Sequence, residues 1–240
     1  MTGAHMILGG KGGVGKSIVA SLIAQYEDAK GNRPLCVDID PAGGTLSGFR
    51  GLDVGRLSVM EGKSVNRRKF DDLVDFMAQR RGREMVVDCG ASIFIPLVHY
   101  MAETKFTENL ADIGRRLILH TVIVGGQALE PSLAGLIEIA DEFPDQATLA
   151  VWLNPYFGHI ERRGRGFEDL DEYTDRKDRV AAIIRMPKMS QLFRRDIEEM
   201  LRRKLTFAEI AMTPGFLVAS KQRLAIIKRR FFELMFAGGL

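Results

Sequence analysis

Short apolar runs alternate with amphipathic stretches along most of the chain. Apolar runs of strand length occupy residues 4–9, 35–40, 85–90, 117–124, 149–153 and 180–184. Apolar residues recur at helical spacing over 16–29, 67–80, 96–116, 131–143 and much of 190–237. Strands that alternate with helices predict a parallel sheet with helices on both faces. We therefore expect an α/β fold, a three-layer sandwich around a mostly parallel, twisted sheet.

Two segments depart from this alternation. Residues 42–66 carry many glycines and few periodic signals, which predicts loops with one short helix. Residues 158–179 are basic in their first part and acidic in their second, which is typical of a surface excursion. Because no repeat, low-complexity tract or linker divides the sequence, we expect 1–240 to form a single domain.

The segment between the first strand and the first helix carries the clearest chemistry. It runs from Gly9 to Ser17, and from Gly10 onward it fits the phosphate-binding pattern G-x-x-x-x-G-K-[ST]. Glycines let backbone N–H groups curl around phosphate oxygens, and a helix N-terminus favours an anion. Lys16 would reach the β- and γ-phosphates, while the Ser17 hydroxyl would bind Mg²⁺. The predicted nucleotide cradle consists of Gly10, Gly12, Gly13, Val14, Gly15, Lys16 and Ser17. An incidental glycine-rich turn is the alternative.

Aspartates close two of the predicted strands. Asp38 and Asp40 end the run at 35–40, and Asp88 ends the run at 85–90. Functional residues gather at the carboxyl ends of parallel strands, so we expect all three near the glycine loop. Asp88 would hold Mg²⁺ directly or through a water, and the other two would support the metal shell and orient the attacking water. For any one of them, a turn-forming role is the alternative.

Composition narrows the setting of the protein. The 240 residues include 34 basic and 31 acidic side chains, a net charge of +3 that is too mild to imply nucleic-acid binding. Both cysteines, Cys36 and Cys89, lie inside apolar runs, which favours a reducing cytoplasm over a disulfide framework. Export is not signalled at the N-terminus, and no run of about 18 apolar residues is present. We expect a cytoplasmic protein.

The glycine loop contains a second lysine, Lys11, which a plain phosphate-binding loop does not require. The run Gly-Lys-Gly-Gly-Val-Gly-Lys-Ser is the deviant Walker A signature, and it resembles the MinD/ParA class of P-loop ATPases. The resemblance implies that Lys11 reaches across a dimer interface to the phosphates of a second copy. It also implies that Asp40 positions the hydrolytic water, that Asp38 completes an aspartate pair, and that Asp88 is the Walker B aspartate. A solvated loop lysine is the alternative for Lys11.

The same resemblance implies a place for the base. In this class an asparagine after a strand and a proline after the last strand contact adenine, and Asn154 and Pro187 match them. An Asn-Pro turn is the alternative for Asn154. The class usually continues Asp-Pro-Gln after its second strand, whereas this chain has Pro41 and Ala42 after Asp40. No segment before the first strand could hold a helix-turn-helix, so site-specific DNA binding is not expected.

A closer resemblance covers nearly the whole chain. Residues 5–8, 34–38, 125–129, 151–156 and 177–180 are similar to the TraL-type conjugal transfer proteins of conjugative plasmids. That similarity implies a role in bacterial conjugation, with proteins of the conjugation machinery as partners. It supplies no mechanism.

Two features of the C-terminal third each allow two interpretations. Residues 218–237 form a predicted amphipathic helix that either packs on the sheet or lies on the inner-membrane surface. Five basic residues either contact DNA non-specifically or belong to a solvated face balanced by acidic neighbours; they are Arg194, Arg195, Arg202, Arg203 and Lys204.

Together these features predict a Mg²⁺-dependent ATPase that acts as a dimeric switch. ATP would bridge two subunits through Lys11, and slow, partner-stimulated hydrolysis to ADP and phosphate would release them. A P-loop phosphotransferase is one alternative, with an acceptor pocket built from 42–66 and 158–179, and Lys11 argues against it. A nucleotide-binding assembly protein with negligible turnover is the other.

Overall fold

A computed structural model describes residues 1–41, 43–143 and 147–240; Ala42 and Pro144, which the sequence places in a loop and after a helix, lie outside them. The main sheet contains β1 (Thr2–Leu8), β2 (Leu35–Asp38), β3 (Val54–Arg56), β6 (Met85–Asp88), β7 (Arg115–Val124), β8 (Thr148–Asn154) and β11 (Val180–Arg185). Its order is β11-β8-β7-β1-β6-β2-β3, and every neighbouring pair is parallel. The predicted parallel sheet is confirmed.

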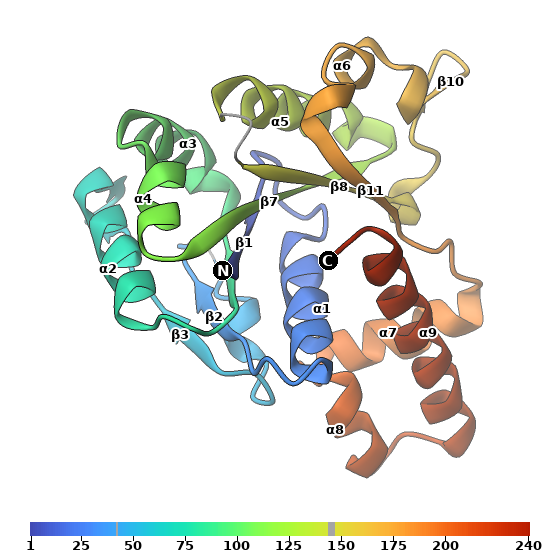
Figure 1. The fold of residues 1–240 in the computed structure, drawn as a ribbon. Helices are drawn as coiled ribbons and strands as arrows, with labels where there is room; N and C mark the ends of the chain where they lie inside the picture. Colours follow the sequence, from blue (N-terminus) through green and yellow to red (C-terminus); the bar gives the residue numbers. More distant parts are fainter. Residues whose placement is uncertain (42, 144–146) are drawn as a thin grey trace.

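Helices cover both faces of this sheet (Figure 1). One side carries α2 (Asp71–Gln79), α3 (Phe94–Glu103), α4 (Phe106–Asp112) and α5 (Leu129–Glu142), and the other carries α1 (Lys16–Ala29), α7 (Gln191–Arg202), α8 (Phe207–Met212) and α9 (Val218–Ala237). Successive residues of β1 serve opposite faces, as strand geometry requires. Met6 and Leu8 join the buried cluster on the first side, whereas Ile7 joins the cluster on the second. The three-layer α/β sandwich is therefore confirmed.

Two stretches differ from the sequence prediction. Within 42–66 the chain adds β3 to the sheet edge by pairing Val54 with Cys36, and it forms a small hairpin from β4 (Met60–Glu61) and β5 (Ser64–Val65). These strands are too short to leave a periodic signal. The predicted helix at 96–116 is two helices and the start of β7, because Lys105 takes a left-handed conformation with φ of +51°.

Arg115 explains why β7 starts earlier than the apolar pattern indicates. The residue is only 1% exposed, and its guanidinium donates hydrogen bonds to the carbonyls of Met77, Arg80 and Arg83. It thereby ties the end of α2 to the start of β6. A buried arginine with backbone partners cannot be told from a solvated one by sequence pattern alone.

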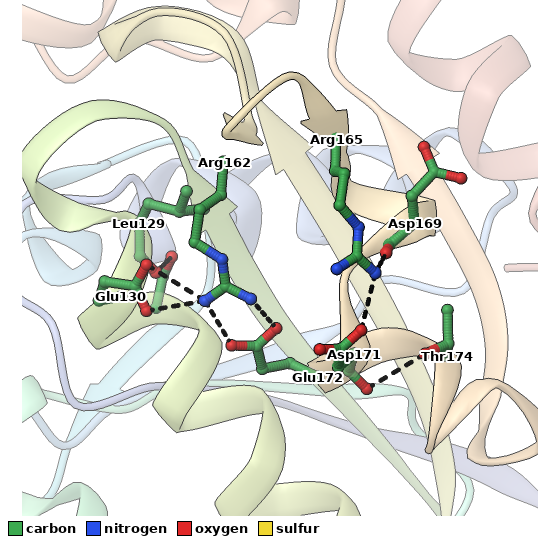
Figure 2. A network of polar contacts seen from close by, with 9 residues as sticks. Leu129, Glu130, Arg162, Arg165, Asp169, Asp171, Glu172 and Thr174 are labelled. Atoms are coloured by element: carbon green, nitrogen blue, oxygen red, sulfur yellow. Dashed lines mark hydrogen bonds and ion pairs between the residues drawn. The ribbon is translucent and has the colours of Figure 1, made fainter.

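Residues 158–179 fold into a compact unit held by ion pairs (Figure 2). The hairpin of β9 (Glu161–Arg162) and β10 (Arg165–Gly166) is followed by α6 (Asp171–Thr174). Arg162 lies between Glu130 of α5 and Glu172 of α6, with both guanidinium nitrogens 2.7 Å from Glu172 oxygens. Arg165 donates to Asp171 at 2.7 Å. Basic and acidic side chains of this segment thus pair with one another, and Arg162 also pairs with α5.

The apolar stripe of α9 is buried. Leu224, Ile227, Phe231 and Met235 are at most 3% exposed and join the cluster that contains α1. This burial favours the packed interpretation of the helix over one in which the stripe contacts a membrane. Among the residues that the structure describes, no helix has both the length and the apolar character to cross a membrane.

The basic residues of α7 and its end also contact the protein itself. Arg202 pairs with Glu199 at 2.7 Å. Arg203 and Lys204 lie over the rings of Phe216 and Phe49 at 5.0 and 5.6 Å from the ring centroids. These contacts favour the solvated, internally balanced face.

Candidate functional site

The glycine loop leaves the carboxyl end of β1, at the centre of the sheet, and feeds α1. Gly9, Gly13 and Gly15 have φ of +153°, +77° and +107°. L-residues rarely adopt these values, so glycine is required there. A Cβ atom at Gly15 would also lie 3.1 Å from Nδ2 of Asn154. Within the described part of the chain, α1 begins without a side-chain cap, and its first N–H groups remain open to a ligand.

The Lys16 side chain lies beneath the glycine loop and is hydrogen-bonded to it. It is mostly buried, and Nζ donates a hydrogen bond to the backbone oxygen of Lys11 at 2.9 Å. Burial lowers the pKa of Lys16, while the negative charges of Asp88 and Asp40 oppose that shift. Lys11 itself is exposed, as are Gly10 and Gly12. The two lysines therefore differ: one faces inward and the other faces solvent.

Asp88 lies directly beside this lysine. It ends β6 and is 1% exposed, and the Ser17 side chain acts to lower the pKa of its carboxyl. Its Oδ2 atom is buried and has no hydrogen-bond partner among the described residues. Burial raises the pKa of Asp88 to about 6, helped by Asp38 and opposed by Ser17 and Lys16. A buried carboxylate oxygen without a partner, next to a hydroxyl, suits a hydrated Mg²⁺ ion.

Asp38 and Asp88 are register partners in the parallel pair β2–β6. Asp38 uses both oxygens on its own loop: Oδ1 accepts from the Asp40 N–H at 3.1 Å, and Oδ2 accepts from the Ser47 N–H at 2.9 Å. These bonds hold the loop that carries Asp40. Asp38 thus fixes the loop and adds negative charge beside Asp88. Asp88 is the carboxylate that has an oxygen without a hydrogen-bond partner among the described residues.

Asp40 rests on the backbone of Gly90. A Cβ atom at Gly90 would lie 2.3 Å from Oδ1 of Asp40, so this position admits no side chain without a shift. Sequence reasoning did not single out Gly90. The only available signal was its position two residues after a strand-end aspartate.

A cavity of about 430 Å³ opens beside the loop and extends between the start of α1 and α7. Asn154 and Pro187 both line it, together with Gly13, Gly15 and Ser17. Asn154 is engaged at both ends of its amide: Nδ2 donates to the Val14 oxygen at 2.9 Å, and Oδ1 accepts from the Tyr156 N–H at 3.1 Å. The structure thus brings the expected base-side residues next to the loop.

A metal would need phosphate ligands as well as protein ligands. In residues 1–41, 43–143 and 147–240, no three His, Cys, Asp or Glu side chains are grouped so that they could hold a metal ion. Ser17 and Asp88 supply two positions, which is the number that Mg²⁺ usually takes from a protein when phosphates and waters complete its shell.

Comparisons with known proteins agree with this geometry. Residues 5–222 match the profile of the CobQ/CobB/MinD/ParA nucleotide binding domain. The chain belongs to this family. Two TraL proteins of Escherichia coli are similar over almost all of their length: one is 44% identical, covering 97% of this chain and 96% of the relative, and the other is 42% identical, covering 100% of both. The TraL-type resemblance is therefore confirmed.

Solved structures show the same fold at low identity. The MinD cell division protein of Aquifex aeolicus has a TM-score of 0.52 and 16% identity, covering 97% of this chain and 98% of that protein. A chain of the MinC:MinD cell division protein complex from the same organism has a TM-score of 0.52 and 17% identity, covering 97% of this chain and 96% of its own length.

The raised pKa of Asp88 predicts a pH-dependent stability difference. The folded protein holds this proton up to about pH 6, whereas an unfolded aspartate loses it near 3.8, so wild-type stability falls as pH rises between those values. Asp88→Asn removes that loss. Its free energy of unfolding relative to wild type should therefore increase between pH 4 and 7, by up to roughly 3 kcal/mol. Denaturant unfolding of both proteins measures the difference, with exposed Asp112→Asn as control. A pH-independent difference would contradict the burial of this charge.

Proposed function

We propose that this protein is a Mg²⁺-dependent ATPase whose ATP-bound form is a dimeric switch in bacterial conjugal DNA transfer. The observation that carries the proposal is that Lys16 and Ser17 lie under the glycine loop beside a buried Asp88 oxygen that has no partner among the described residues. Membership of a MinD/ParA-type nucleotide-binding family supports the nucleotide, and the resemblance to TraL supports the setting in a conjugating cell.

In this proposal the loop binds the triphosphate. The backbone N–H groups of residues 10–17 would surround the phosphate oxygens, and Lys16 would move its ammonium from the Lys11 carbonyl to the β- and γ-phosphates. Ser17 and Asp88 would hold Mg²⁺, with Asp38 adding charge from the adjacent strand. Bound Mg²⁺ neutralises charge on the β- and γ-phosphate oxygens.

Asp40 would orient the attacking water. Its carboxylate lies on Gly90, and its charge acts on Lys16. The water oxygen forms a bond to the γ-phosphorus while the bond to the β-phosphate oxygen breaks, which yields ADP and phosphate. The water's proton leaves to phosphate or solvent. Because Asp38 accepts hydrogen bonds from the Asp40 N–H and the Ser47 N–H, a change at the phosphates that moves Asp38 would also move these two residues.

Lys11 supports a two-chain site. It is exposed on the loop while its own carbonyl oxygen holds Lys16 in place, so its ammonium can reach a second copy without disturbing its own cradle. Hydrolysis would remove the phosphate that both chains share and release the dimer. The output would then be a change in binding to proteins of the conjugation machinery, in the cytoplasm or at the inner membrane.

The phosphotransferase alternative gains no support from the excursion at 158–179. In the described chain that segment provides none of the residues that line the cavity, and its Arg162 and Arg165 are paired with acidic side chains of the segment and of α5. Of residues 43–66, which the structure describes, only Thr45 and Phe49 line the cavity. This small contribution to the cavity argues against an acceptor pocket built from the two segments.

Lys11→Ala tests the two-chain site. The variant should bind ATP with wild-type affinity, because Lys16 still contacts the phosphates in the same chain. It should fail to dimerise, because the phosphates bound by each chain lose the Lys11 ammonium of the other chain. Sedimentation velocity with ATP and with ADP measures the dimer, and Lys63→Ala, a change of another exposed lysine, is the matched control. Normal ATP-dependent dimers in the Lys11 variant would reject the shared site.

Asp40→Asn tests hydrolysis. Phosphate release should fall by about a hundredfold, because a neutral amide accepts a weaker hydrogen bond from the attacking water than a carboxylate does and so orients it poorly. ATP binding should persist, so that the variant accumulates as the ATP-bound dimer. Colorimetric phosphate assays alongside sedimentation give both readouts, with exposed Asp72→Asn as control. Wild-type phosphate release would remove Asp40 from the site.

A further inference from the structure

An aromatic ring stands at the mouth of the cavity next to the glycine loop. Tyr156 is 51% exposed and lines the cavity with Gly13, Gly15 and Ser17. It follows Asn154 and Pro155 at the end of β8, in the short helical turn Pro155–Phe157. Exposed aromatic rings beside a phosphate cradle are suited to stacking against a flat heteroaromatic group.

Four contacts hold Tyr156: one through its backbone N–H and three through its side chain. The Tyr156 N–H donates to Oδ1 of Asn154 at 3.1 Å, and its hydroxyl donates to Oε1 of Glu198 at 3.1 Å. The Arg194 guanidinium lies 5.2 Å from the ring centroid, which is within cation–π range. Phe157 packs edge-on against it, with centroids 5.0 Å apart. A ring that is already ordered loses little conformational entropy when a ligand stacks on it.

Asn154 links this ring to the glycine loop. The same amide that accepts from Tyr156 donates to the Val14 oxygen at 2.9 Å, in the middle of the loop. The buried Asn154 side chain therefore sets the distance between the Tyr156 ring and the phosphate-binding loop. A nucleotide demands such a fixed spacing, because its base and its phosphates are joined through one ribose.

We propose that Tyr156 and Arg194 form the stacking wall for the base of the bound nucleotide, and that Asn154 is a positioning residue that fixes this wall relative to the phosphate cradle. The inference rests on the proposed function, since it assumes that a nucleotide occupies the loop. Tyrosine rings and arginine planes stack on bases through faces that every base possesses. The wall therefore contributes affinity for the base.

Paired titrations with Mg²⁺–ATP and with Mg²⁺–tripolyphosphate test the wall, because the second probe carries phosphates without a base. Tyr156→Ala should weaken ATP binding by about tenfold and leave tripolyphosphate binding unchanged. Arg194→Ala should shift the ATP affinity in the same direction. Tyr156→Phe keeps the ring and should stay within about twofold of wild type. Leu192→Ala, an exposed change on α7 outside the cavity, is the control.

The positioning role of Asn154 gives a different pattern. Asn154→Ala frees the Val14 oxygen as well as the Tyr156 N–H, so affinity for both probes should fall. A loss confined to ATP would mean that Asn154 reads the base directly, and it would overturn this part of the proposal.

Two results would overturn the wall itself. Unchanged ATP affinity in Tyr156→Ala would exclude stacking, and equal losses for ATP and tripolyphosphate would mean that the ring only shapes the loop. Either result leaves the proposed function intact, because the wild-type protein still binds ATP. If the wild-type protein binds neither probe, the proposed function and this inference both fail.

Discussion

The parallel register of β1, β6 and β2 is the constraint on which the site depends. Asp88 is paired in register with Ile7 of β1 and with Asp38 of β2, so the two carboxylates and the glycine loop end at one point of the sheet. Val86 and Cys36, two residues earlier, belong to the cluster beneath α1, and alternation places both aspartates on that same face. A slip of one residue would turn Asp88 away from Lys16 and Ser17.

This arrangement costs stability in the folded chain. Two buried carboxylates on adjacent strands repel each other, and burial raises the pKa of Asp88 to about 6. Lys16 offsets part of the cost, yet its own pKa is lowered by burial. The loop adds backbone conformations that only glycine adopts readily. Conflicts of this kind concentrate at functional sites, where a ligand supplies the missing partner. A Mg²⁺–triphosphate would satisfy the Asp88 oxygen, the Lys16 ammonium and the open start of α1 together.

The fold and the loop could be predicted because their signals are local. Helical spacing over 16–29 gave the bounds of α1, and the glycine–lysine pattern needs only a strand before it and a helix after it. What could not be predicted depends on contacts distant in sequence. Arg115 is buried because its guanidinium can donate hydrogen bonds to the carbonyls of Met77, Arg80 and Arg83. The short strand at Val54 forms by pairing with the strand that contains Cys36. Asn154 matched a family position, but its bond to Val14, 140 residues away, is a property of the folded chain.

Binding of Mg²⁺–ATP to the wild-type protein and to Lys16→Ala is the most direct test of the central claim, that the loop at 9–17 is a nucleotide cradle. Isothermal titration should show one ATP per wild-type chain. The variant should bind at least a hundredfold more weakly, as expected for loss of a buried charge-assisted contact worth about 3 kcal/mol. Circular dichroism would check that the variant is folded. Equally tight ATP binding by folded Lys16→Ala would contradict the account.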